Sequence, residues 1–150
     1  MIKILLCLLL NLLILIPLTA APFDGRYIRF ESFLPEFAGK QVTGIMSILQ
    51  DKEGFLWFGT GMGLAKYYGY DFTFYSPSAD EKTISQPLIV YPVIEDHAGD
   101  IWMGTNGQGL FRFDKGKEAF VQYRHNPTDT ASLSDDIVLA IQEDKNGSLW

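Results

Sequence analysis

The sequence predicts an all-β protein, a β-propeller built from four-stranded antiparallel blades, and three observations support this fold class. A ten-residue segment at 51–60 returns at 96–105 and begins a third time at Asp144. Its tryptophans, Trp57, Trp102 and Trp150, lie 45 and 48 residues apart. Each repeat also contains several short apolar or aromatic runs that are separated by Gly, Asp or Pro. Four short strands that recur at a period in the forties are typical of one propeller blade.

The first repeat predicts four strands, at 42–50, 55–60, 64–68 and 72–75. The first is a nearly continuous apolar run, as expected for a strand that is covered on both faces. A tight Asp-x-x-Gly turn at 51–54 joins it to the second, because Asp caps backbone N–H groups and Gly accepts a positive φ. A β-sandwich also has many short strands, but it gives no reason for Trp-x-Gly-Thr to return at this spacing.

Along the chain, blade one is expected at about 42–75 and blade two at about 88–124. Blade three begins at 137 and is incomplete at Trp150, so we expect the chain to be the first part of a longer protein. A separate strand at about 28–33 precedes the first blade. Its Phe30 corresponds to residues in the outermost strands of the later blades. We therefore expect it to close the ring by completing a last blade.

Four repeated positions have a physical role in such a blade. Trp57 and Trp102 are large enough to fill the space between neighbouring blades. Gly59 and Gly104 lack a Cβ atom and let the next sheet approach closely. Pro92 falls in the innermost strand of blade two, where its missing donor can point away from the strand ladder, and we expect a β-bulge there.

Residues 1–21 are predicted to form a secretory signal peptide. Lys3 provides the positive start, 4–16 an apolar stretch, Pro17 a break, and 19–21 a cleavage site of small residues. The alternative is an uncleaved anchor, although the stretch is shorter than the ~20 residues of a membrane span. Residues 22–150 then form the exported part of the chain, so we expect a periplasmic location.

Composition excludes several classes of function. Cys7 is the only cysteine and lies in the predicted signal, so the exported chain has no disulfide, thiol nucleophile or cysteine metal site. The formal net charge is −6 and no basic cluster is visible, which argues against nucleic acid as a partner.

No catalytic, metal or cofactor site is predicted, and no individual ligand-binding residue can be identified. Asp51, Asp96 and Asp144 each occupy the same Asp-x-x-Gly turn, so a structural role is expected for all three. His97 and His125 have no companion at metal-ligand spacing. We therefore expect no enzymatic activity from these 150 residues.

Two further patterns have a structural and a functional interpretation. The glycine-rich segment 59–64 lacks the Lys-Ser/Thr and the helix of a phosphate-binding loop, so we expect a turn between strands. Tyr67, Tyr68 and Tyr70 could stack on sugars, but packing between blades is the more common role of such a cluster.

The segments 47–64 and 93–114, which contain Gly-Phe-Leu-Trp-Phe-Gly-Thr and Gly-Asp-Ile-Trp-Met-Gly-Thr, resemble the two-component regulator propeller repeat. The linker at 123–135 is similar to that family's inter-repeat segment. The resemblance implies a seven-bladed ring in the periplasmic region of a membrane-anchored, dimeric bacterial sensor. A transmembrane helix would lead to a histidine kinase or a diguanylate cyclase. The implied partners are an oligosaccharide or other small ligand and the remaining blades of the same chain.

The main functional hypothesis is therefore a ligand-sensing propeller of a transmembrane signalling protein. The alternative is a secreted propeller enzyme, such as a polysaccharide lyase or a streptogramin-type lyase. For the sensor, the ligand is expected at one face of the ring or in its central channel. The face where outer strands connect to the next inner strands is favoured, because connections vary freely while strands are committed to packing. The segments on that face are 34–41, 61–63, 76–87, 106–108 and 125–136.

Overall fold

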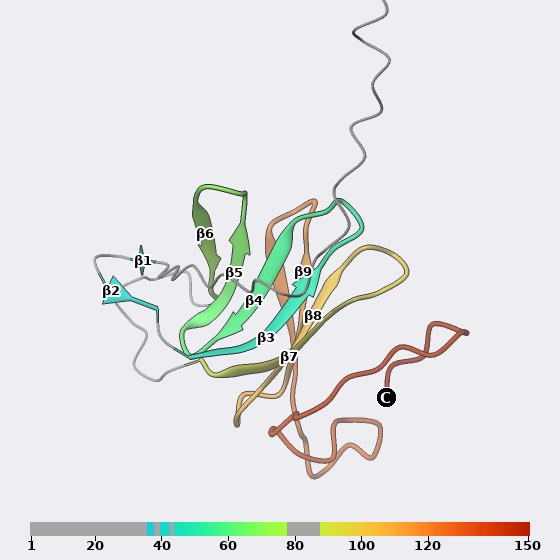
Figure 1. Ribbon diagram of the computed structural model, residues 1–150. Helices are drawn as coiled ribbons and strands as arrows, with labels where there is room; N and C mark the ends of the chain where they lie inside the picture. Colours follow the sequence, from blue (N-terminus) through green and yellow to red (C-terminus); the bar gives the residue numbers. More distant parts are fainter. Residues whose placement is uncertain (1–35, 38–39, 43, 78–87) are drawn as a thin grey trace, which may run out of the picture. The chain divides into compact units, whose positions relative to one another are not determined.

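The computed structural model describes residues 36–37, 40–42, 44–77 and 88–150 (Figure 1). The predicted signal peptide, the closing strand at 28–33 and most of the 76–87 loop lie outside the described residues. Two short strands, β1 (Glu36–Phe37) and β2 (Lys40–Gln41), pair with each other. The described part of the chain holds no helix long and apolar enough to cross a membrane.

Two four-stranded antiparallel sheets follow, and each is formed by consecutive strands (Figure 1). The first sheet has the order β3-β4-β5-β6, and the second has the order β7-β8-β9-β10. These sheets confirm the predicted all-β class and the four-stranded blade. The strand bounds are β3 (Ile45–Gln50), β4 (Leu56–Thr60), β5 (Gly63–Tyr67), β6 (Phe72–Tyr75), β7 (Val90–Glu95), β8 (Ile101–Thr105), β9 (Leu110–Asp114) and β10 (Ala119–Tyr123).

The innermost strand of each sheet contains a bulge. Pairing between β3 and β4 shifts between Ile45 and Ser47, and pairing between β7 and β8 shifts between Val90 and Val93. The irregularity predicted at Pro92 is therefore present. Because β3 has the same bulge without a proline, the bulge belongs to the innermost strand of the repeat rather than to Pro92.

The core lies between the two sheets, where β7 packs against β3 and β4. Trp57 is fully buried, and its ring centroid lies 5.8 Å from that of Phe113 in the second sheet and 5.7 Å from that of Tyr75. Tyr75 and Phe113 also contact each other, at 4.6 Å. The predicted role of Trp57 between blades is confirmed.

The two glycines of the repeat lie where the next unit approaches. A Cβ at Gly59 would lie 2.9 Å from the carbonyl oxygen of Val90, and one at Gly104 would lie 2.6 Å from that of Val138. Real Cβ atoms do not approach backbone oxygens so closely, so a side chain is excluded at both positions. The backbone around Val138 thus packs on the second sheet as Val90 packs on the first.

Residues 137–150 repeat the start of a blade. The backbones of Gln142 and Trp150 exchange two hydrogen bonds of 2.8 Å, and an isolated bridge joins Glu143 to Leu149. The turn between them begins at Asp144 and has Gly147 at φ +82°. This segment therefore contains the Asp turn of a third repeat and its first strand pairing.

Candidate functional site

The Asp turns form one edge of the sheets. Asp51 Oδ1 accepts backbone N–H bonds from Glu53 at 3.0 Å and Phe55 at 2.9 Å, while its Oδ2 accepts the indole Nε1–H of Trp57 at 2.8 Å. The carboxylate is thus an acceptor for the turn and for the core tryptophan at once. The structural role predicted for Asp51 is confirmed.

The other two turns repeat this arrangement. Asp96 accepts the Nε1–H of Trp102 at 2.7 Å and the backbone N–H of Asp100 at 2.9 Å. Asp144 accepts the Nε1–H of Trp150 at 3.1 Å, together with two backbone N–H groups of its own turn.

These contacts determine the charge state of the turn carboxylates. Burial by itself raises the pKa of Asp51, but the hydrogen bonds from Trp57 and Phe55 and the nearby Lys115 outweigh it, so the pKa falls below 3.8. The pKa of Asp96 is lowered in the same way, because bonds from Trp102 and the turn backbone outweigh burial. Both side chains are therefore ionised near neutral pH, where they act as hydrogen-bond acceptors.

Two lysines cross the interface between the first two repeats at this edge. Lys115 Nζ, from the β9–β10 turn, lies 2.9 Å from Glu95 Oε1, 3.3 Å from Glu53 Oε1 and 3.5 Å from Asp51 Oδ2. In the opposite direction, Lys52 Nζ donates to the carbonyl oxygen of Asp96 at 2.7 Å. A cavity of about 430 Å³ opens beside these groups. Its polar lining is engaged in joining the two repeats, so we do not take it as the ligand site.

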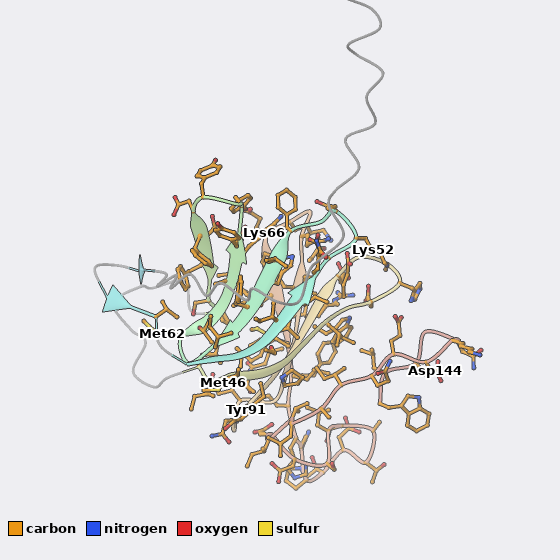
Figure 2. The ribbon with its side chains drawn as sticks, in the orientation of Figure 1. Met46, Lys52, Met62, Lys66, Tyr91 and Asp144 are labelled. Carbon is orange, nitrogen blue, oxygen red and sulfur yellow. The ribbon has the colours of Figure 1, made fainter. Side chains whose placement is uncertain are left out.

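The opposite edge carries the turns between second and third strands, as Met62 and Lys52 show at the two ends of the first sheet (Figure 2). Thr60 Oγ1 donates to the carbonyl of Gly63 at 2.8 Å and accepts the N–H of Met62 at 3.0 Å. Thr105 closes the corresponding turn of the second sheet, donating to Gly109 at 2.7 Å. The glycine-rich segment 59–64 is therefore a turn between strands, as predicted.

Asp136 ties the 125–136 loop to this edge. Its carbonyl oxygen accepts the N–H groups of Gly107 at 3.1 Å and Gly109 at 2.7 Å. Its carboxylate accepts the N–H of His125 at 2.8 Å and pairs with the guanidinium of Arg124. The loop and the 106–108 turn thus lie together, which confirms the prediction that these two segments share one edge.

The 125–136 loop is also stabilised by hydrogen bonds between its own residues. Asn126 Oδ1 accepts the N–H of Thr128 at 3.1 Å, and Ser132 Oγ accepts the N–H of Asn126 at 2.9 Å. His125 Nδ1 lies 2.7 Å from the carbonyl oxygen of Leu133. His125 therefore has a structural partner within the loop, and side-chain hydrogen bonds connect several positions of the loop backbone.

The three tyrosines do not assemble into one platform. Tyr67 and Tyr68 line a shallow cavity of about 330 Å³ at the Asp-turn edge, while Tyr70 lies outside it and is 85% exposed. Tyr68 packs on Phe55, with the ring centroids 5.5 Å apart, and Lys66 Nζ lies 3.9 Å from the Phe55 centroid. The packing interpretation fits Tyr68 better than a stacking role.

A second aromatic surface is formed by Trp102, which stacks on Tyr123 with centroids 5.5 Å apart. It borders a cavity of about 540 Å³ that extends to Leu149 and the 125–136 loop. Trp57 and Tyr75 form the corresponding pair in the first sheet, and there Phe113 of the next sheet covers them. By this equivalence the cavity is a packing surface for a blade. Among the described residues, no group of His, Cys, Asp and Glu is arranged to hold a metal ion.

Two features of these edges were missed by the sequence reasoning. The Asp–Trp bond had a signal, since Trp follows Asp by six residues in all three repeats, and a buried indole N–H needs an acceptor. The cluster of carboxylates around Lys115 had no signal in the sequence, because its members are up to 64 residues away from Lys115 in sequence.

The fold and its repeated Asp–Trp turns define a β-propeller repeat protein. The family model described as "Two component regulator propeller" matches residues 39–62, and the resemblance to this repeat family is confirmed. Two extracellular domains of hybrid two component systems from B. thetaiotaomicron have the same fold. That of BT3049 is 31% identical over 71% of this chain with a TM-score of 0.61, and that of BT4673 is 26% identical over 81% with a TM-score of 0.59. The chain spans 15% and 17% of those structures, and a search of curated proteins finds no match.

Proposed function

We propose that this chain is the beginning of the periplasmic sensing region of a transmembrane signalling protein, in which a closed propeller binds a small ligand of the saccharide class without converting it. The observation that supports this most is the combination of the repeat geometry with likeness to extracellular domains of hybrid two component systems. The proposal includes export by residues 1–21, further blades, a dimeric parent, and a histidine kinase or a diguanylate cyclase as the output domain.

The edge that carries the 61–63, 106–108 and 125–136 segments is the proposed ligand face. Asp136 holds the loop against the 106–108 turn through two backbone bonds, so we expect this part of the surface to be ordered before any ligand arrives. An ordered surface binds with a smaller loss of conformational entropy than a mobile one. The Asp-turn edge, by contrast, has its side chains committed to holding repeats together.

The side chains along this face fit a saccharide. Asn106 and Asn126 are exposed and Gln108 is half-buried, so the connections on this edge of the second repeat carry three amide side chains. Each amide can both donate and accept, as a sugar hydroxyl does. Several amides on one edge are therefore suited to a ligand that presents several hydroxyl groups.

The test is calorimetry of the purified full-length periplasmic region with a panel of oligosaccharides, with product analysis in parallel. Gln108→Ala should weaken binding, whereas Lys117→Ala, at an exposed turn on the other edge, should leave it unchanged. Binding without product formation supports the sensor. Steady conversion of any substrate would contradict it and favour the lyase alternative.

A further inference from the structure

The residue that follows the turn Asp is a contact between repeats in both described interfaces. The backbone N–H of Lys52 donates to Glu95 Oε2 at 2.7 Å, and the backbone N–H of His97 donates to Glu143 Oε2 at 2.9 Å. In each pair the acceptor is the Glu directly before the next turn Asp. The same joint therefore occurs twice, with different side chains on the donor residue.

The two donor residues differ in their side chains. Lys52 Nζ donates to two backbone carbonyls of the next turn, Asp96 at 2.7 Å and His97 at 3.1 Å. His97 instead places Nδ1 2.5 Å from Glu143 Oε1, and its ring lies against Gly147, where a Cβ would be 2.9 Å from Cε1. Histidine changes charge between about pH 5 and 8.

Glu143 pairs with His97 across the joint between the second and third repeats. Its side chain is only 17% exposed, and within the described ranges His97 is the cationic group that it contacts. Glu95 at the first joint has Lys115 as well, at 2.9 Å. Loss of the proton from His97 therefore removes the charge attraction between these two side chains across the joint.

We propose that the joint between the second and third repeats is pH-sensitive through the contact of His97 with Glu143, while the joint between the first and second repeats is not. The charged groups that face His97 are Glu143 from the third repeat, Asp96 from its own turn and Lys52 from the preceding turn. The two carboxylates favour the imidazolium and Lys52 opposes it.

The direction follows from these neighbours. The hydrogen bond and charge of Glu143 raise the pKa of His97 above 6.5 in the folded protein. A group whose pKa is raised on folding stabilises the fold below its unfolded pKa, and this contribution is lost as pH rises through the folded pKa. The joint is therefore tight in mildly acidic medium and loosens at alkaline pH.

The experiment is hydrogen exchange with mass spectrometry on the full-length protein at about pH 6 and pH 8, corrected for intrinsic exchange rates. Protection of peptides that cover 137–150 should fall roughly two- to fivefold at the higher pH, as expected for an ion pair that is partly exposed. His97→Lys, which reproduces the first joint, should abolish that pH dependence. Glu143→Gln should abolish it too, and peptides that cover 51–60 should be unaffected in all variants, which controls for folding.

Two results would overturn the proposal. One is equal protection of 137–150 at both pH values in the unmodified protein. The other is a pH dependence that persists in His97→Lys while the 51–60 peptides remain protected, because another group would then be responsible.

Discussion

The carboxylate of Asp51 and the indole of Trp57 are joined by a hydrogen bond of 2.8 Å between Oδ2 and Nε1, and both side chains are buried. The other oxygen of the same carboxylate closes the turn. One residue therefore shapes the turn and orients the ring that packs between repeats. Because Asp96 and Trp102 repeat this bond at 2.7 Å, it is a property of the repeat unit.

Removing the Asp96 carboxylate should lower the free energy of unfolding by more than the loss of the turn hydrogen bond alone. In the full-length protein, Asp96→Ala deprives Trp102 of its acceptor and the turn of its cap, and we predict a loss of about 2–3 kcal/mol in the free energy of unfolding, as for bonds to charged groups. Asp96→Asn keeps one acceptor oxygen and should cost less. Denaturant unfolding of the two variants measures both, and an Asp96→Ala variant as stable as the parent would refute the bond's importance.

The indole ring and its N–H can be separated by substitution. Trp57→Ala leaves a cavity between the two sheets and should destabilise by roughly 3–5 kcal/mol, the range for large aromatic truncations. Trp57→Phe retains much of the packing against Phe113 and loses only the bond to Asp51 and part of the ring. In thermal unfolding, the melting temperature should be highest for the parent, lower for the Phe variant and lowest for the Ala variant. A reversed order would mean that packing does not dominate at this position.

Close approach of the next repeat should make Gly59 intolerant of a methyl group. In Gly59→Ala the new Cβ would meet the carbonyl of Val90, and we predict a loss of about 1–3 kcal/mol from overpacking. Gly116 is the matched control, because the nearest atom to a methyl group added there is Asp114 Oδ1, at an ordinary 3.4 Å. Equal unfolding midpoints for the two alanine variants would contradict the predicted contact.

Acid should destabilise the repeats through their turn aspartates. Since the pKa values of Asp51 and Asp96 are lowered in the folded protein, their contribution is present above the unfolded value of about 3.9 and is lost as pH falls through the folded values. Asp96→Asn should reduce the steepness of this loss. The measurement is the free energy of unfolding from about pH 6 to pH 2.5, and the same steepness in the variant and the parent would exclude Asp96 as a contributor.

The sequence was sufficient to predict the blade and its contacts of short range. Repetition places Trp57, Gly59 and their counterparts at fixed positions in each blade. The large ring of the tryptophan then predicts that it fills the space between blades, and the missing Cβ of the glycine predicts close approach of the next sheet. The Asp turns were predicted for the same reason, because all their backbone bonds lie within five residues.

Contacts between repeats could not be predicted, since they depend on which side chains face each other across an interface. Lys115 reaches Glu95 and Asp51 from a turn that has no lysine in the first repeat, so repetition gives no signal for it. The pairing of His97 with Glu143 likewise requires the stacking of two units. The sequence also did not reveal that Asp136 fastens the 125–136 loop, because its partners belong to another turn.

The proposed function requires that a ligand binds at the loop edge and is released chemically unchanged. The most direct measurement is hydrogen exchange of the full-length periplasmic region with and without the oligosaccharide that binds tightest in calorimetry, followed by recovery and mass analysis of that oligosaccharide. We predict added protection in 61–63, 106–108 and 125–136, no change in 51–54 and 96–99, and an intact oligosaccharide. Protection confined to the Asp turns, or a recovered product of altered mass, would contradict the proposed function.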